Sequence, residues 1–140
     1  MMAPLMLNKI PFFADLTHED TLTLMGCMHQ VSYSRGEKIF REDDPADHLY
    51  LIIEGSVKIF KEGLTYPTIL ATVPAGGFFG EFGLIDGLPR SASAGANTDC
   101  KLMRLSGKDF ETVIRVSPSI ARNVMRNLVR LLREKPVPKK

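Results

Sequence analysis

Hydrophobic and polar positions change their spacing twice along the chain, which divides it into three parts. Apolar residues recur at helical spacing up to about residue 29, alternate with polar residues from about 31 to 106, and return to helical spacing from 108. The pattern predicts helices at about 6–29, strands at about 31–106, helices at about 108–135 and a tail at 136–140. Short strands separated by glycine turns are typical of a closed antiparallel sheet. We therefore expect a mainly β fold, an antiparallel β-roll or jelly roll with flanking helices.

The first part contains one well-marked helix, at about 18–28. Thr17 stands before it and Asp20 three residues further on, a pairing typical of a helix N-terminus. We expect its apolar side chains to pack in a core; these are Leu22, Leu24, Met25 and Met28.

The middle part contains short runs bounded by glycine, proline and acidic residues. Strands are predicted at 31–33, 38–40, 48–54, 56–61, 68–73, 92–96 and 101–105. The acidic segment 41–47 lies between two of them and is expected to be an exposed loop.

The last part predicts two helices, at 108–116 and 119–135, separated by Ser117-Pro118 and stopped by Pro136 and Pro138. On the longer helix an apolar stripe is formed by Ile120, Val124, Leu128 and Leu131, widened by Ala121, Met125 and Leu132. A basic stripe is formed by Arg122, Arg126, Arg130 and Arg133. The apolar stripe is expected to close over the roll and to pack partly on a second copy. The basic stripe is either solvated or faces an acidic partner or nucleic acid.

Composition and charge narrow the class of protein. With 140 residues, 44% hydrophobic and 24% charged, the chain fits one folded domain, 1–140. Residues 1–100 hold 7 basic against 13 acidic side chains, net −6, and residues 101–140 hold 11 against 3, net +8. No secretion signal or membrane span is indicated, and the cysteines, Cys27 and Cys100, are not spaced for a metal site. We expect a cytoplasmic protein that binds no metal.

The candidate chemistry lies at 76–96, where five glycines precede one arginine. Glycines at 76, 77 and 80 permit a close backbone approach, and one helical turn at 81–85 would point its first amides at an anion. Pro89 fixes the backbone before Arg90, whose guanidinium suits a phosphate. The Glu81 carboxylate is suited to accepting hydrogen bonds from sugar hydroxyls. The alternative is a glycine-rich surface turn with an incidental ion pair between Glu81 and Arg90.

Gly80-Glu81-Phe82-Gly83-Leu84, followed by Pro89-Arg90-Ser91-Ala92, resembles the phosphate-binding cassette of cyclic nucleotide-binding domains. The resemblance extends from about residue 7 to about 133 and includes cAMP-dependent kinase regulatory subunits and the bacterial catabolite activator family. It implies that Glu81 binds the ribose 2'-hydroxyl, that Arg90 binds the cyclic phosphate, and that Ser91 and the amide of Ala92 add phosphate contacts. The motif residues Gly80, Phe82 and Gly83 belong to the same ligand site. Positions matching those that line the purine in similar proteins are Ile59, Leu70 and Val73, which serve equally well as plain core.

The resemblance implies a regulatory module rather than an enzyme. Its ligand is expected to be cAMP, with cGMP as the alternative, because similar bacterial domains with serine at position 91 look like cAMP sensors. A signal would pass through the helix at 119–135, hinged near 116–118, to an unidentified effector protein, and a homodimer is possible. How the base is capped is open, because the capping positions of the family match residues near Pro136.

Two alternatives belong to other classes. One is a DNA-binding transcription regulator or a fragment of one, although residues 135–140 leave no room for a recognition helix, so nucleic-acid binding by this chain alone is not expected. The other is a metal-dependent enzyme of the cupin type. It is disfavoured because the histidines, His18, His29 and His48, do not have the spacing of metal ligands.

Overall fold

The computed structural model describes residues 7–134, which form two compact units. One unit is Cys27–Phe110, and the other joins 7–26 to 111–134. Two antiparallel sheets with flanking helices confirm the predicted fold class. The expectation of a single domain stays a prediction. Met6, the predicted last helical residue Lys135 and the predicted tail lie outside the described residues.

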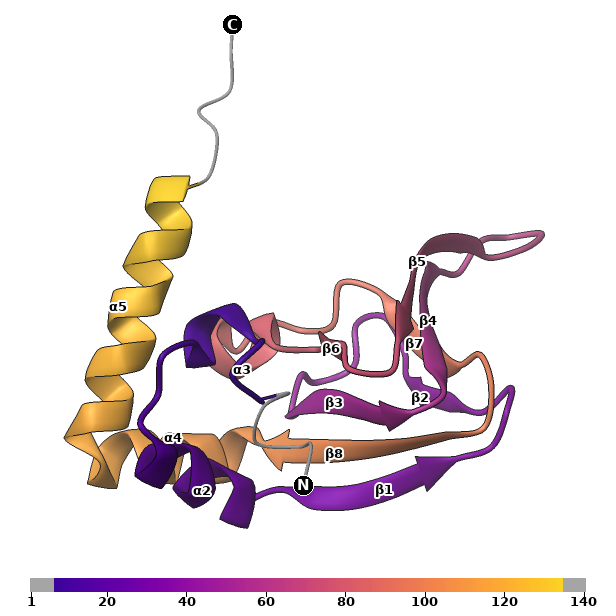
Figure 1. The fold of residues 1–140 in the computed structure, drawn as a ribbon. Helices are drawn as coiled ribbons and strands as arrows, with labels where there is room; N and C mark the ends of the chain where they lie inside the picture. The colour runs from indigo at the N-terminus through magenta and orange to yellow at the C-terminus, as the bar shows by residue number, and fades with distance from the viewer. Residues whose placement is uncertain (1–6, 135–140) are drawn as a thin grey trace, which may run out of the picture. The chain divides into compact units, whose positions relative to one another are not determined.

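The unit Cys27–Phe110 is built from two four-stranded antiparallel sheets (Figure 1). The first has the strand order β1-β8-β3-β6, and the second the order β2-β7-β4-β5. Their bounds are β1 His29–Tyr33, β2 Lys38–Phe40, β3 His48–Glu54, β4 Ser56–Lys61, β5 Thr68–Pro74, β6 Phe78–Phe79, β7 Ser93–Ala96 and β8 Cys100–Ser106. All except β6 overlap a predicted strand. Two-residue β6 was missed because two phenylalanines among glycines give no alternating pattern.

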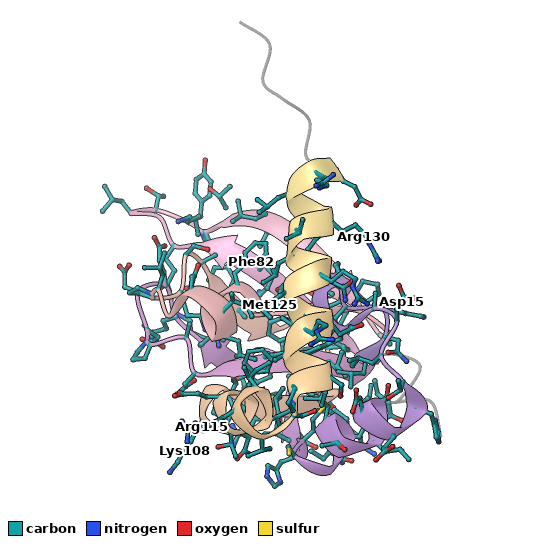
Figure 2. All side chains as sticks on the ribbon, turned by 90° about the vertical axis from the view of Figure 1, so that its left-hand side faces the viewer. Asp15, Phe82, Lys108, Arg115, Met125 and Arg130 are labelled. Carbon is teal, nitrogen blue, oxygen red and sulfur yellow. The ribbon has the colours of Figure 1, made fainter. Side chains whose placement is uncertain are left out.

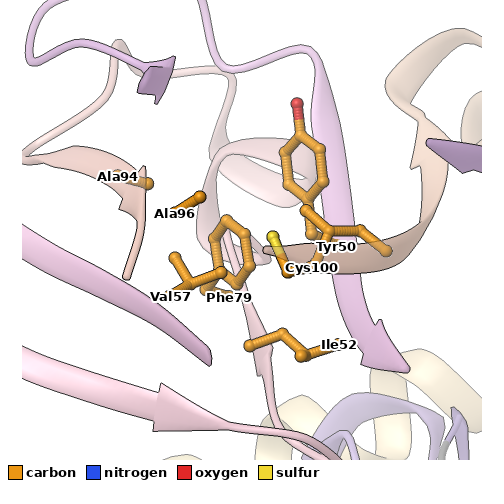
Figure 3. Packing of buried hydrophobic residues seen from close by; sticks show 8 residues of the cluster. Tyr50, Ile52, Val57, Phe79, Ala94, Ala96 and Cys100 are labelled. Atoms are coloured by element: carbon orange, nitrogen blue, oxygen red, sulfur yellow. The ribbon is translucent and has the colours of Figure 1, made fainter. Parts of the chain in front are cut away.

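The core of the roll lies between the two sheets (Figure 3). Large side chains come from the first sheet and small ones from β7; the buried cluster is Tyr50, Ile52, Val57, Phe79, Ala94, Ala96, Cys100 and Leu102. The rings of Tyr50 and Phe79 stack with centroids 4.9 Å apart. Burial raises the pKa of Tyr50 to about 12, so its phenol is neutral at physiological pH.

The second unit pairs the N-terminal segment with the long C-terminal helix. The 3₁₀ helix η1 spans Pro11–Phe13, α2 spans His18–Gly26, and α5 spans Pro118–Glu134 and packs on η1. The predicted cap of α2 is present, because the amide of Asp20 donates to the Thr17 hydroxyl at 3.0 Å. Ser117 does the same for α5, accepting from the amide of Ile120 at 3.4 Å.

Three side chains of α5 hold the N-terminal segment. The side-chain amides of Asn123 and Asn127 both donate to the carbonyl of Ala14 at 2.8 Å. Further along α5, Arg130 Nη1 lies 3.2 Å from Asp15 Oδ2 (Figure 2). These contacts attach α5 to the segment over successive helical turns.

Some of the predicted packing is wrong. Leu22 is 51% exposed. The buried residues of α2 are Thr21 and Leu24. Leu22 lies about 100° around the helix from Thr21 and therefore on a different side. On α5, Ile120 and Val124 are buried, whereas Met125 and Leu132 of the predicted wider stripe are exposed, so partial packing of this stripe on a second copy stays a prediction.

The helix α4, Gly107–Val116, contains the boundary between the two units, which falls after Phe110. α4 ends at Val116 and α5 begins at Pro118, so Ser117 alone separates the two helices. No helix within residues 7–134 has both the length and the apolar character needed to span a membrane.

Candidate functional site

The glycine-rich segment folds around the side chain of Arg90. Gly80 has a φ of 79°, and a Cβ at this position would lie 2.8 Å from Arg90 Nη1 and 3.1 Å from the carbonyl oxygen of His48. Both the backbone conformation and the lack of space therefore require glycine. The carbonyl of Gly80 accepts a hydrogen bond from Arg90 Nη1 at 3.1 Å.

The guanidinium of Arg90 is buried, and each of its two terminal nitrogens donates to a protein carbonyl. Its Nη2 donates to the carbonyl of His48 at 2.6 Å, and its central carbon lies 4.0 Å from the centroid of the Phe40 ring. The residue is 6% exposed, yet its Nε is buried and has no hydrogen-bond partner. Leaving a buried N–H of a charged group unpaired is costly, so the site is incomplete without an acceptor. Within the described chain Arg90 forms no ion pair with Glu81, so the alternative based on that pair does not match the fold.

The backbone of Arg90 is held by the acidic loop 41–47. The amide of Asp43 donates to the carbonyl of Arg90, and the amide of Arg90 donates to the carbonyl of Asp44, both at 2.8 Å. Asp43 adopts a φ of 71°, which is uncommon for a residue other than glycine. This loop therefore positions the arginine, a role that sequence reasoning did not assign to it.

The predicted helical turn is found one residue later than expected, as α3, Phe82–Asp86. Gly83 lies against Ala46 of the acidic loop, and a Cβ on Gly83 would overlap the Cβ of Ala46. The close approach of α3 to the loop therefore depends on glycine at this position. The use of the first amides of α3 as an anion site stays a prediction.

These elements surround a pocket of about 440 Å³, within the range of small-molecule sites. Predicted site residues in its lining are Ile59, Val73, Gly80, Glu81, Phe82, Gly83, Arg90, Ser91 and Ala92. Lining residues that were not assigned to the site from the sequence are Phe40, Ala46, Phe78, Phe79, Asp86, Leu88 and Pro89. The separate parts of the chain that bring in Phe40 and Ala46 carry no local motif that could have identified them.

Leu70 is not among the lining residues. On the β4–β5 ladder Ile59 is opposite Ala71, whereas Phe60 is opposite Ile69, so Leu70 is the extra residue of a bulge. It is 54% exposed. Its predicted contact with a purine stays a prediction.

Comparison with known proteins places this geometry in a family. The family model described as the cyclic nucleotide-binding domain matches residues 30–117. The chain belongs to this family. It is 35% identical over 125 residues to the cyclic AMP receptor protein of Thermus thermophilus, covering 89% of this chain and 58% of that protein. It is 30% identical over 108 residues to a cAMP-dependent protein kinase regulatory subunit of Emericella nidulans, covering 77% of this chain and 26% of that protein.

A solved structure gives the same result for the fold. The N-terminal domain of a transcriptional regulator from Streptomyces coelicolor superposes with a TM-score of 0.85 at 35% identity, covering 92% of this chain and 91% of that one. The resemblance to catabolite activators and kinase regulatory subunits is thus confirmed. The chain spans only about a quarter to three fifths of the length of the two named relatives.

In this cyclic nucleotide-binding domain, two opposite charges at the pocket are both desolvated. Burial lowers the pKa of Arg90, although Tyr50 and nearby carboxylates oppose this effect. Burial raises the pKa of Glu81, opposed by a backbone hydrogen bond and by Arg90. A ligand with an anionic group for Arg90 and hydroxyl donors for Glu81 would offset both desolvation costs. Among the described residues no group of three His, Cys, Asp or Glu side chains could hold a metal ion.

Proposed function

We propose that this chain is a sensor that binds cAMP, and that it is not an enzyme. The single observation that carries the proposal is the buried Nε of Arg90, which lacks an acceptor although the two Nη atoms are bonded to carbonyls. A cyclic phosphate can accept a hydrogen bond from this Nε while the two Nη atoms keep their bonds to the carbonyls. The family assignment supports the same ligand class.

The remaining roles follow from the chemistry of the pocket. Glu81 accepts hydrogen bonds from the ribose 2'-hydroxyl, and Ser91 and the amide of Ala92 contribute to the phosphate. Gly80, Phe82 and Gly83 shape the backbone around these groups. Ile59 and Val73, half-buried in the lining, contact the purine, and Leu70 joins them if β5 rearranges around the base.

We propose cAMP ahead of cGMP. The serine at position 91 is exposed, so its hydroxyl is available either to the phosphate or to the 2-amino group of a guanine. Relatives are named for both nucleotides, as cyclic AMP receptor, cAMP-dependent kinase and cGMP-dependent kinase proteins. The highest identities among these belong to the cAMP-named relatives.

Isothermal titration calorimetry with cAMP, cGMP and 5'-AMP tests the proposal. We expect saturable binding of cAMP, weaker binding of cGMP and much weaker binding of 5'-AMP, whose phosphate is not held in a ring. If none of the three nucleotides gave a heat of binding, the proposed nucleotide-binding function would be contradicted. Equal or tighter binding of cGMP would reverse only the choice of base.

We further propose that binding alters the packing of α5 and that α5 passes the signal to an effector protein or a second copy. The hinge predicted at 116–118 lies between α4 and α5, and Ser117 caps α5 there. The basic side chains Arg122 and Arg126 are exposed and suit an acidic partner. A cytoplasmic location fits such a sensor. The N-terminal domain from Streptomyces coelicolor favours, as the second candidate, the sensor part of a transcription regulator.

Hydrogen exchange with and without saturating cAMP tests this transmission. We expect changed protection at 76–96 and also at 116–133. Changes confined to 76–96 would mean that the nucleotide binds but does not act through α5.

A further inference from the structure

A second pocket lies on the outer face of the β2-β7-β4-β5 sheet. In the strand register Lys38 is opposite Gly95, and Gly95 is opposite Lys58. Ala94 and Ala96, on either side of Gly95, are buried in the core of the roll. Because side chains alternate along a strand, Gly95 and its two opposite lysines face outward. Two lysines therefore flank a position that has no side chain.

An aromatic ring forms the floor between these lysines. Phe60 is two residues from Lys58 on β4 and so faces outward as well. It is only 5% exposed, yet it is not part of the core cluster of the roll. Its Cε1 lies 3.5 Å from the point that a Cβ on Gly95 would occupy. The buried ring is therefore covered from outside the roll rather than by its core.

The turn between β4 and β5 supplies the wall of this pocket. Thr65, Tyr66 and Pro67 are among its lining residues, and its volume is about 310 Å³. None of its lining residues lines the Arg90 pocket. Strand β4 directs Ile59 into the Arg90 pocket and Lys58 into this one, so the two pockets occupy opposite faces of one sheet.

The charges of this outer pocket do not cancel. Lys38 Nζ lies 2.6 Å from Glu62 Oε1, and this hydrogen bond lowers the pKa of Glu62, which is therefore ionised. Lys58 forms no ion pair within the described part of the chain, and its Nζ lies 5.8 Å from the centroid of Phe60. Two ammonium groups against one carboxylate leave a single positive charge beside an aromatic floor.

We propose that this outer pocket binds a small aromatic monocarboxylate. The carboxylate pairs with the ammonium of Lys58, and the ring of the ligand lies against Phe60, over Gly95 and beneath Tyr66. One negative charge matches the one unpaired ammonium, and an apolar ring fits beside Phe60 and Gly95 better than a hydrated anion does. The same chemistry occurs in a free aromatic acid and at the C-terminus of a peptide that ends in phenylalanine. We assign the free acid.

Benzoate is a suitable probe for the full chain, followed by nitrogen-edited NMR. We expect saturable shifts of the amides of Thr65, Tyr66 and Gly95, with half-saturation about tenfold lower for benzoate than for neutral benzamide or for acetate. Equal titration by benzamide, non-saturating shifts, or shifts centred on Gly80 and Arg90 would each overturn the proposal. Tighter binding of N-acetyl-phenylalanine than of benzoate would overturn the free acid as the occupant in favour of a peptide terminus.

Matched variants separate the site from general effects on the fold. Lys58→Met keeps the length of the side chain and is expected to weaken benzoate about tenfold. Gly95→Ala adds a Cβ whose nearest atoms lie at 3.5 to 3.7 Å, so the chain should fold while the floor of the outer pocket is filled and benzoate is lost. Lys101→Met, on β8 of the other sheet, is the control and should leave the titration unchanged. An unchanged titration in Lys58→Met would contradict the proposal.

Discussion

The two ends of the Arg90 pocket differ in how firmly the protein holds them. At the anion end, the backbone of Arg90 is hydrogen-bonded on both sides to the acidic loop, and its side chain is bonded to two carbonyls. At the base end, Ile59 and Val73 are only half-buried on β4 and β5, and Leu70 lies outside the lining. The anion end is thus built before a ligand arrives, whereas the base end consists of partly buried apolar side chains that pack against the core of the roll.

This difference predicts where binding energy resides. Preorganised polar groups bind a charged ligand without further ordering, so changes there should be costly. Apolar side chains that are already largely buried have little surface left for a ligand to cover, so changes at the base end should be mild.

Removal of the arginine should have the largest effect. Arg90→Ala deprives the cyclic phosphate of its positive charge and should cost about 2 to 5 kcal/mol, roughly 30-fold to several thousand-fold in cAMP affinity. Calorimetry gives the affinity, with Arg35→Ala on an exposed loop as the control for loss of charge. If Arg90→Ala bound cAMP with wild-type affinity, Arg90 would not be part of the binding site.

A glycine-to-alanine change should disturb the same end through the backbone. Gly83→Ala pushes α3 away from Ala46 and should cost about 1 to 3 kcal/mol of stability, with a parallel loss of cAMP affinity. Urea denaturation and calorimetry measure the two effects. Gly26→Ala, where no atom lies near the added Cβ, is the matched control. If Gly83→Ala retained both properties, the contact between loop and helix would not position the site.

The acid at position 81 should make binding depend on pH. Burial raises its pKa in the free protein, and ribose hydroxyls that donate to the carboxylate should lower the pKa in the complex. Affinity should therefore be full above the free-protein pKa and fall as the pH drops through it, by up to about tenfold for each unit of difference between the two values. Calorimetry between about pH 4 and 7 follows this change. Glu81→Gln should flatten the profile, and an unchanged slope in that variant would assign the proton to another group.

Changes at the base end should be the smallest. Val73→Ala is expected to weaken cAMP by about 1 kcal/mol or less, because little of its side chain is left exposed for the base to cover. Leu70→Ala should be nearly neutral if Leu70 stays outside the pocket in the complex. A loss in Leu70→Ala larger than that in Val73→Ala would show that β5 rearranges around the base. Parallel titrations with cGMP would show which side chain affects the choice of base.

Sequence reasoning predicted the anion end better than the surroundings that hold it. The elements at 76–92 are local, so glycine spacing and one arginine suffice to identify them. The acidic loop is distant in sequence, and its contribution comes from backbone groups that every residue type possesses. For that reason the side chains of the acidic loop predicted only that the loop is exposed to solvent.

The errors in packing have a similar cause. Leu22 has an apolar side chain at helical spacing, but which side of a helix is buried is decided by the partner it meets. Leu70 follows the alternating pattern of a strand, and a one-residue bulge removes it from that pattern. Strand positions were predicted more accurately because glycine, proline and acidic residues mark their ends.

The carbonyl of Ala14 determines how α5 can move. Two asparagines one turn apart share this single acceptor, so sliding the helix along its axis would break both bonds at once. Tilting α5 together with the N-terminal segment keeps both bonds. Mechanically, the helix and residues 7–15 behave as one lever, and a force applied to either should be felt by the other.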